Sequence, residues 1–213
     1  MKAAYGFDEL VAALSGAEDL ISALRLIMPP ARWRHSEAAS RLAASLAAEY
    51  GHPEAAEVRR AALLHDVGRT LRASAWASIA DWHGWPPDDD EWAGGAGLLH
   101  GPAGAAAGTA LGLTAEGAAA VRYHVTGRPG LTLADKIVMA ADAAEETRRY
   151  RWAPTARRAL ADSLELAVAF WVTLKAEMVR AAGLALHPRS RQTLAYLGAD
   201  VVAAARRLAV PFL

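Results

Sequence analysis

Six side chains of two ligand types stand out in this chain as able to do chemistry together. Four of the seven histidines fall at the starts or ends of expected helices, and two aspartates lie in apolar segments. The set is His35, His65, Asp66, His100, His124 and Asp142. Imidazole and carboxylate together suit borderline or hard transition metals, and buried carboxylates need a cation or hydrogen-bond partners. Six such ligands are too many for one tetrahedral ion, but they are enough for two ions if one carboxylate bridges.

The neighbouring pair His65-Asp66 sets a geometric condition on such a site. Side chains at adjacent helix positions diverge by about 100°, so these two cannot both point squarely at one ion. They can straddle an ion that lies against the helix face, which places the carboxylate well for bridging. The i, i+4 histidine pair of zinc proteases is absent from the sequence.

Each of these residues also has a simpler interpretation. A single histidine at a helix end is commonly a surface residue or a hydrogen-bonded core residue. The glycines beside His100 could serve only close helix packing, and Asp142 could be a local cap or the partner of Arg148 or Arg149. The metal hypothesis therefore depends on whether the six side chains converge.

Helices must position these side chains, because apolar residues recur at helical spacing along almost the whole chain. Alanine, the best helix former, accounts for 53 of the 213 residues. No segment alternates convincingly over five or more residues, so the sequence predicts an all-α fold. The expected helices span residues 7–27 (as one or two helices), 36–50, 53–67, 75–82, 102–111, 115–123, 133–149, 154–182 and 189–208.

Composition limits the classes of function that this chain can serve. Basic and acidic residues number 23 each, and the resulting zero net charge argues against electrostatic binding to nucleic acid or membrane surfaces. The absence of cysteine removes disulfides, thiolate metal sites and cysteine nucleophiles. The longest apolar run, residues 166–172, is too short to span a membrane, and acidic residues near the N-terminus do not fit a signal peptide. We expect a cytoplasmic protein with a single domain over residues 1–213.

The order of five short motifs resembles the HD superfamily of metal-dependent phosphohydrolases. The motifs are Arg32-Trp33-Arg34-His35, Leu63-Leu64-His65-Asp66, Leu99-His100-Gly101, Tyr123-His124-Val125-Thr126-Gly127 and Ala141-Asp142. Within the superfamily, the chain is similar to the YqeK family of symmetrical diadenosine tetraphosphate hydrolases. Arg69, Val125 and Glu146 stand where that family usually has Lys, Thr and Pro.

This resemblance implies a helical HD-domain bundle with additional N- and C-terminal helices. The metal-binding core would cover residues 30–150, and bracing helices would cover residues 154–208. The resemblance also implies two metal ions held by the six residues named above, with iron as the native metal and manganese, cobalt or zinc as alternatives. Asp66 would bridge the ions. The implied reaction cleaves dinucleoside tetraphosphates into two nucleoside diphosphates.

In this hypothesis, two cations neutralise phosphate charge and lower the pKa of a water molecule toward about 7. Asp66 and Glu145 are the candidate catalytic residues, with Glu145 orienting a ligand histidine or pairing with Arg148. The candidate substrate-binding residues are Arg32, Arg69, Thr126, Gly127, Arg128 and Arg148. Two other hypotheses stay open: an HD phosphohydrolase of nucleoside mono- or triphosphates, and a nucleotide-binding HD protein without turnover.

Two further regions carry weaker predictions. The tryptophan-rich segment 76–92 could form a lid that stacks on a nucleobase, or it could only pack and anchor a loop. The helices after Pro154 are expected to brace the core, and residues 170–172 could form a homodimer interface. We assign His52, His83 and His187 to structure or surface.

Overall fold

The computed structural model describes residues 5–212, and the predicted all-α fold is confirmed there. Residues 1–4 and 213, which the expected single domain includes, lie outside the described part. The α-helices are α1 (Phe7–Ser15), α2 (Leu20–Ile27), α3 (Pro30–Glu49), α4 (Ala55–Leu64), α5 (Ala73–Trp76), α6 (Asp89–Gly94), α7 (Ala96–Ala110), α8 (Ala115–Tyr123), α9 (Leu133–Ala144), α10 (Ala153–Asp162), α11 (Leu164–Ala181), α12 (Pro188–Leu197) and α13 (Ala199–Ala209). Short 3₁₀ helices are η1 (Val67–Thr70), η2 (Asp81–Gly84) and η3 (Val210–Phe212).

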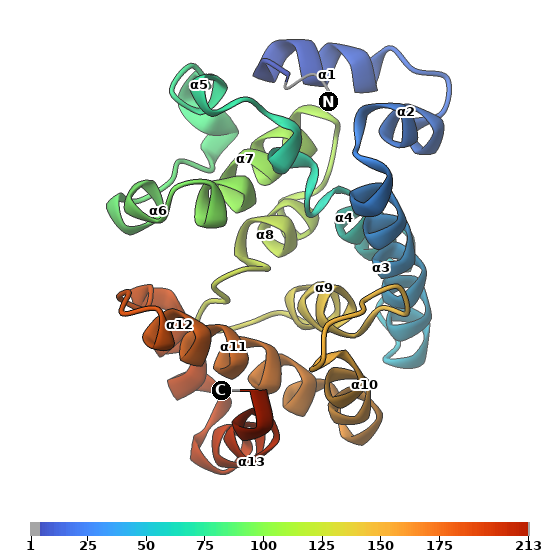
Figure 1. Cartoon of the computed structure of the whole chain (residues 1–213). Helices are drawn as coiled ribbons and strands as arrows, with labels where there is room; N and C mark the ends of the chain where they lie inside the picture. Colours follow the sequence, from blue (N-terminus) through green and yellow to red (C-terminus); the bar gives the residue numbers. More distant parts are fainter. Residues whose placement is uncertain (1–4, 213) are drawn as a thin grey trace.

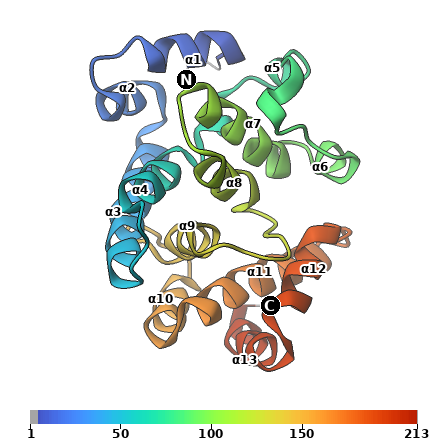
Figure 2. The ribbon, with the colours of Figure 1, turned by 180° about the vertical axis from the view of Figure 1, so that it is seen from behind.

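The helices that carry the predicted ligands form the centre of the molecule (Figure 1). α3 packs against α4 and α9, and α8 packs against α4, α7 and α9. The first two helices and α5 lie at one end of this centre, whereas α10 to α13 lie at the other end, as the reverse view also shows (Figure 2). The N-terminal and C-terminal additions therefore flank the central helices from opposite ends.

Two helices begin several residues earlier than the sequence predicted: α3 starts at a proline, and α7 starts before a proline that lies inside it. Pro30 is the first residue of α3, where its missing N–H costs no helical hydrogen bond. α7 begins at Ala96, and Pro102, which we expected to start the helix, lies buried inside it. Packing on both sides of α7 outweighs the local preference of this proline for a helix start. The additional turn places His100 within the helix.

Four predicted helices are shorter or divided in the structure. The helix expected over 53–67 ends at Leu64, and residues 67–70 form η1. The helix expected over 133–149 ends at Ala144. Ser163 caps α11 with its hydroxyl and so separates α10 from α11, and Gly198, with a φ of 90°, separates α12 from α13. The early end of α9 leaves residues 145–152 free to form a loop next to the predicted site.

The tryptophan-rich segment does not form the expected helix over 75–82. α5 ends at Trp76, and residues 81–83 adopt positive φ, which a continuous right-handed helix excludes. Asp88 then caps α6 and forms a capping box with Glu91, so the segment contains a helix that our interpretation missed.

Small side chains let the central helices pack closely. Ala61 and Ala62 of α4, and Ala140 and Ala141 of α9, are completely buried. Residues 170–172 are buried inside the chain as well, so these side chains offer no surface to a second copy, and the homodimer expected of the helices after Pro154 stays a prediction. Within residues 5–212, every helix is too short or too polar to cross a membrane.

Candidate metal centre

His35, His65 and Asp142 form a first group of ligand atoms. They come from α3, from the residue that follows α4, and from α9. The Nε2 atom of His35 lies 3.1 Å from His65 Nε2 and 3.1 Å from Asp142 Oδ1, and His65 Nε2 lies 3.6 Å from the same oxygen. Adjacent ligands of one octahedral ion with bonds of about 2.1 Å are about 3 Å apart, so this group fits a cation.

A second group joins His65 to Asp66 and His124, whose ligand atoms lie within 4.8 Å of one another. His100 extends this group, because its Nε2 atom lies 3.1 Å from His124 Nε2 and 3.5 Å from Asp66 Oδ1. The structure thus brings all six sequence-predicted ligands together, in two adjoining groups that share His65. Because the Nε2 atom of an imidazole has one lone pair, His65 could bind only one ion, and a second ion would need its ligands from the remaining residues of the two groups.

Each histidine of the set turns Nε2 toward the other ligands because its Nδ1 atom has a hydrogen-bond acceptor. His35 Nδ1 lies 3.0 Å from Glu145 Oε1. The other acceptors are the backbone carbonyl oxygens of Ala62 for His65 (2.6 Å), Ala96 for His100 (3.1 Å) and Val121 for His124 (2.7 Å). With each Nδ1–H donating, the Nε2 atoms of His100 and His124 face each other as two lone pairs. A cation would relieve this repulsion, so the donor set fits a metal ion.

Electrostatics keeps the carboxylates ionised and two of the imidazoles neutral. Burial would raise the pKa of Asp66 and of Asp142, but nearby histidines and arginines outweigh it and hold both pKa values well below the usual range. Burial lowers the pKa of His100 to about 3 and that of His124 well below its usual value. Burial also opposes protonation of His35, but hydrogen bonds to two carboxylates raise its pKa to about 9.

Close backbone contacts bring the second ligand group together. A Cβ atom on Gly68 would collide with the carbonyl oxygen of His100, so glycine is needed for η1 to approach α7. A Cβ atom on Gly101 would lie 2.7 Å from the carbonyl oxygen of Arg122, at the contact of α7 with α8. The glycine beside His100 therefore serves helix packing, and this packing sets the distances between ligands.

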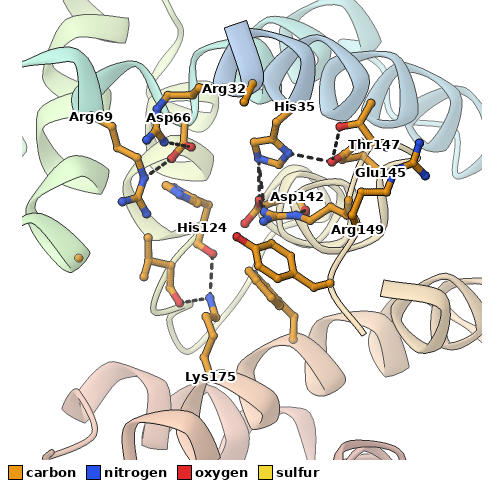
Figure 3. A pocket seen from close by; sticks show the side chains of 16 residues that line it. Arg32, His35, Asp66, Arg69, His124, Asp142, Glu145, Thr147, Arg149 and Lys175 are labelled. Atoms are coloured by element: carbon orange, nitrogen blue, oxygen red, sulfur yellow. Dashed lines mark hydrogen bonds and ion pairs between the residues drawn. The ribbon is translucent and has the colours of Figure 1, made fainter. Parts of the chain in front are cut away.

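A cavity of about 650 Å³ opens beside these ligands (Figure 3). Four of the six predicted ligands line it, whereas His65 and His100 are almost fully buried. Five basic side chains also line it: Arg32, Arg69, Arg148, Arg149 and Lys175. The cavity therefore combines a candidate cation site with a concentration of positive charge that suits an anionic ligand.

Three of the predicted arginines contact the carboxylates of the ligand groups. Arg32 and Arg69 donate hydrogen bonds to Asp66 at 2.7 and 2.6 Å, and Arg148 pairs with Asp142. All three line the cavity, so their guanidinium groups lie beside the ligand groups and can meet a phosphate bound there.

The other three predicted substrate-binding residues are not part of the cavity lining. The Arg128 guanidinium is held by Asp135 at 2.8 Å, and the Thr126 hydroxyl is buried and donates to the Gly127 carbonyl oxygen. Gly127 packs against Thr193. The turn after α8 thus directs these groups toward α9 and α12, and we withdraw them from the substrate-binding set.

Glu145 lines the cavity and holds the candidate ligand His35. Its carboxylate accepts from His35 Nδ1 and from the backbone N–H and hydroxyl of Thr147, and these contacts lower the pKa of Glu145 although burial opposes them. This role matches the alternative in which Glu145 orients a ligand histidine.

Two kinds of cavity residue were missed in the sequence: a lysine on α11 and aromatic side chains. Lys175 Nζ donates to the carbonyl oxygens of His124 and Val125, and Tyr150 and Trp171 line the same cavity. Burial and nearby arginines lower the pKa of Lys175 to about 7, against the opposing effect of Asp142. A lysine directly after an apolar run, in a chain with three lysines, was the one available signal.

A third cluster, Asp88, Glu91 and His187, also contains possible ligand atoms. In this cluster Glu91 pairs with Arg122 and Arg189, and Asp88 pairs with Arg189 and His187, so it offers one imidazole where the central site offers four. This cluster ties α6 to α12, in agreement with the structural role assigned to His187.

Comparisons with known proteins agree with the geometry of the central helices. The HD domain family matches residues 32–147, a range that begins just before His35 and ends just after Asp142. This chain belongs to the HD-domain family. Its fold is similar to that of a solved structure described as a predicted HD superfamily hydrolase involved in NAD metabolism from Clostridium acetobutylicum. That match has a TM-score of 0.75 and 24% identity, and covers 91% of this chain and 97% of the other. No curated protein matches the chain.

Proposed function

We propose that this HD-domain protein is a metal-dependent phosphohydrolase that cleaves dinucleoside tetraphosphates, such as diadenosine tetraphosphate, into two nucleoside diphosphates. The proposal joins the YqeK-like motifs of the sequence to the site described above. The observation that carries it is that two adjoining groups of metal-ligand atoms share His65 beside a cavity with five basic side chains.

Different residues would bind the metal ions, bind the phosphate chain and orient a ligand in such a reaction. Bound divalent or transition-metal ions would supply a Lewis acid that polarises phosphate oxygens and activates water. Arg32 and Arg69, on one side of Asp66, and Arg148, next to Asp142, bind and orient the phosphate chain through charge-assisted hydrogen bonds. Glu145 holds the His35 ring in the orientation that exposes Nε2.

The amount of charge favours a chain of several phosphates over a single phosphate. Four arginines and a lysine line one cavity with three carboxylates, so the lining is net positive before any cation binds, and bound cations would add to that charge. A tetraphosphate chain carries enough negative charge to engage the ligand groups and the surrounding cations together.

The test combines metal analysis of the purified protein with chromatography of its products from diadenosine tetraphosphate, with ferrous or manganous ion supplied. We expect bound metal and two molecules of ADP per substrate. Release of single phosphates from nucleoside mono- or triphosphates would favour the alternative phosphohydrolase. Bound metal without hydrolysis of any phosphoester or phosphoanhydride would favour a nucleotide-binding protein. NAD belongs in the substrate panel, because the similar solved structure is described as involved in NAD metabolism.

A further inference from the structure

The cavity has an aromatic side that the metal and phosphate chemistry leaves unused. Tyr150 and Trp171 line the cavity together with the ligand residues His35, Asp66, His124 and Asp142. Tyr150 follows the early end of α9, and Trp171 belongs to α11. Both lie outside residues 32–147, the part of the chain that matches the HD domain.

These side chains form a column of rings that we call the aromatic wall: Tyr150, Trp152 and Trp171. The Tyr150 and Trp152 rings are stacked, with centroids 5.2 Å apart and planes 8° apart, and the Trp152 and Trp171 centroids are 5.1 Å apart. Trp152 and Trp171 are buried, whereas Tyr150 is 59% exposed. The buried indoles thus fix the plane of an exposed ring at the cavity edge.

Arg148 connects the aromatic wall to the ligand groups. Its guanidinium carbon lies 5.5 to 5.8 Å from the centroids of all three rings, and the same guanidinium pairs with Asp142. A ligand whose phosphate meets Arg148 therefore lies close to the exposed ring of Tyr150. A nucleotide has this combination, a planar base near a charged phosphate, whereas an inorganic polyphosphate has only the charge.

We propose that Tyr150 is a specificity-determining residue that stacks on a nucleobase of the substrate, with Trp152 and Trp171 holding it in place. The proposal rests on the proposed hydrolysis of nucleotides and states how the site recognises the nucleoside part. It also moves the base-stacking role away from the tryptophan-rich segment 76–92, whose aromatic side chains are not part of the cavity lining. Trp85 in that segment instead donates to the Thr109 hydroxyl, and Trp82 packs edge-on against Trp92.

The test compares two ligands that differ only in the nucleoside. ADP and inorganic diphosphate are titrated by calorimetry into the manganese-loaded protein, with quenching of tryptophan fluorescence as a second signal. The variants are Tyr150→Ala, which removes the ring, and Tyr150→Phe, which keeps it. Tyr50→Ala is the matched control, because Tyr50 is partly exposed at the end of α3 and is not part of the cavity lining.

We expect Tyr150→Ala to weaken ADP binding by about 5- to 150-fold, the usual range for loss of one base–aromatic stack. Diphosphate binding should stay within about twofold, and Tyr150→Phe and Tyr50→Ala should bind ADP like the unmodified protein. Unchanged ADP binding in Tyr150→Ala, or equal loss for both ligands, would overturn the stacking role while leaving the phosphohydrolase proposal in place. An unmodified protein that binds neither ligand would overturn both proposals.

Discussion

The central helices and the C-terminal helices contribute different chemistry to one cavity. All six candidate metal ligands come from residues 35–142, within the part that matches the HD domain; backbone carbonyl oxygens or Glu145 hold the histidines, and arginines hold the two aspartates. The C-terminal part contributes Tyr150, Trp171 and Lys175 to the cavity lining, and none of these belongs to a ligand group. In the proposed function, the family's core therefore supplies the reactive centre and the C-terminal part selects the ligand. The predictions below separate these two contributions.

The largest effect is expected from Asp66, the carboxylate of the second ligand group. Asp66→Asn keeps the shape of the side chain but removes the negative charge that would bind a cation and that holds Arg32 and Arg69. Hydrolysis should fall by more than the roughly 10- to 100-fold loss that follows removal of an outer-shell partner. Steady-state kinetics on diadenosine tetraphosphate measures this. Activity within tenfold of the unmodified protein would show that Asp66 is not at the reacting centre.

A smaller loss of activity, without loss of bound metal, is expected from a substitution in the C-terminal part. Lys175→Ala removes a cation that lies 4.6 Å from the Trp171 ring centroid and next to the His124 carbonyl oxygen. Losing one charge-assisted contact to phosphate should lower kcat/KM by about 10- to 100-fold. The metal content should not change, since Lys175 belongs to neither ligand group. Lys175→Arg should recover part of the loss. Loss of metal together with activity would instead make Lys175 a structural support of the core.

Glu145→Ala should weaken metal binding by roughly 10- to 100-fold, because the His35 ring loses the carboxylate that orients it. Glu145→Gln, which keeps an acceptor oxygen for His35 Nδ1, should lose less. Competition with a chelator measures the affinity. Unchanged metal affinity in Glu145→Ala, together with loss of activity, would return Glu145 to the catalytic role suggested by the sequence.

The smallest effect on activity is expected at Arg128. Because Asp135 holds its guanidinium away from the cavity, Arg128→Ala should change kcat/KM by no more than about twofold. Urea unfolding should show a loss of stability, since the buried Asp135 carboxylate loses its partner. A large rise in KM with unchanged stability would restore Arg128 to the substrate-binding set.

The sequence predicts the role of a site residue when that role depends on the residue's type and its neighbours in the chain. It fails when the role depends on a contact with a residue far away in the sequence. The ligand histidines could be found because their type alone limits their chemistry and because helices hold them in order. Thr126 and Arg128 were misplaced because the direction of a turn depends on distant partners such as Asp135 and Thr193. Lys175 was missed because it meets Val125 from 50 positions away, and local pattern carries no information about such a contact.

The helix bounds, too, could be predicted where they depend on neighbouring residues and not where they depend on distant contacts. The helices that Thr114 and Thr132 cap begin at residues 115 and 133, as the sequence predicted, because a cap is a local hydrogen bond. The start of α7 was wrong because the burial of Pro102 inside a packed helix is decided by α8 and η1, not by its neighbours in sequence. The early end of α9 was missed for a related reason: Arg157 of α10 holds the carbonyl oxygens of Ala144 and Glu145. Because α9 ends at Ala144, the following residues form a loop, and this loop contains Tyr150.

The most direct test of the central claim is the number of manganese ions per chain, measured by mass spectrometry after reconstitution and desalting. If each ligand group holds one ion, the unmodified protein binds about two ions, and His65→Ala, which loses the Nε2 ligand of one of them, binds about one. Asp88→Asn, in the separate cluster beside α6, keeps the helix cap and should still bind two. An unmodified protein without bound manganese, or a His65→Ala variant that retains both ions, would contradict the account.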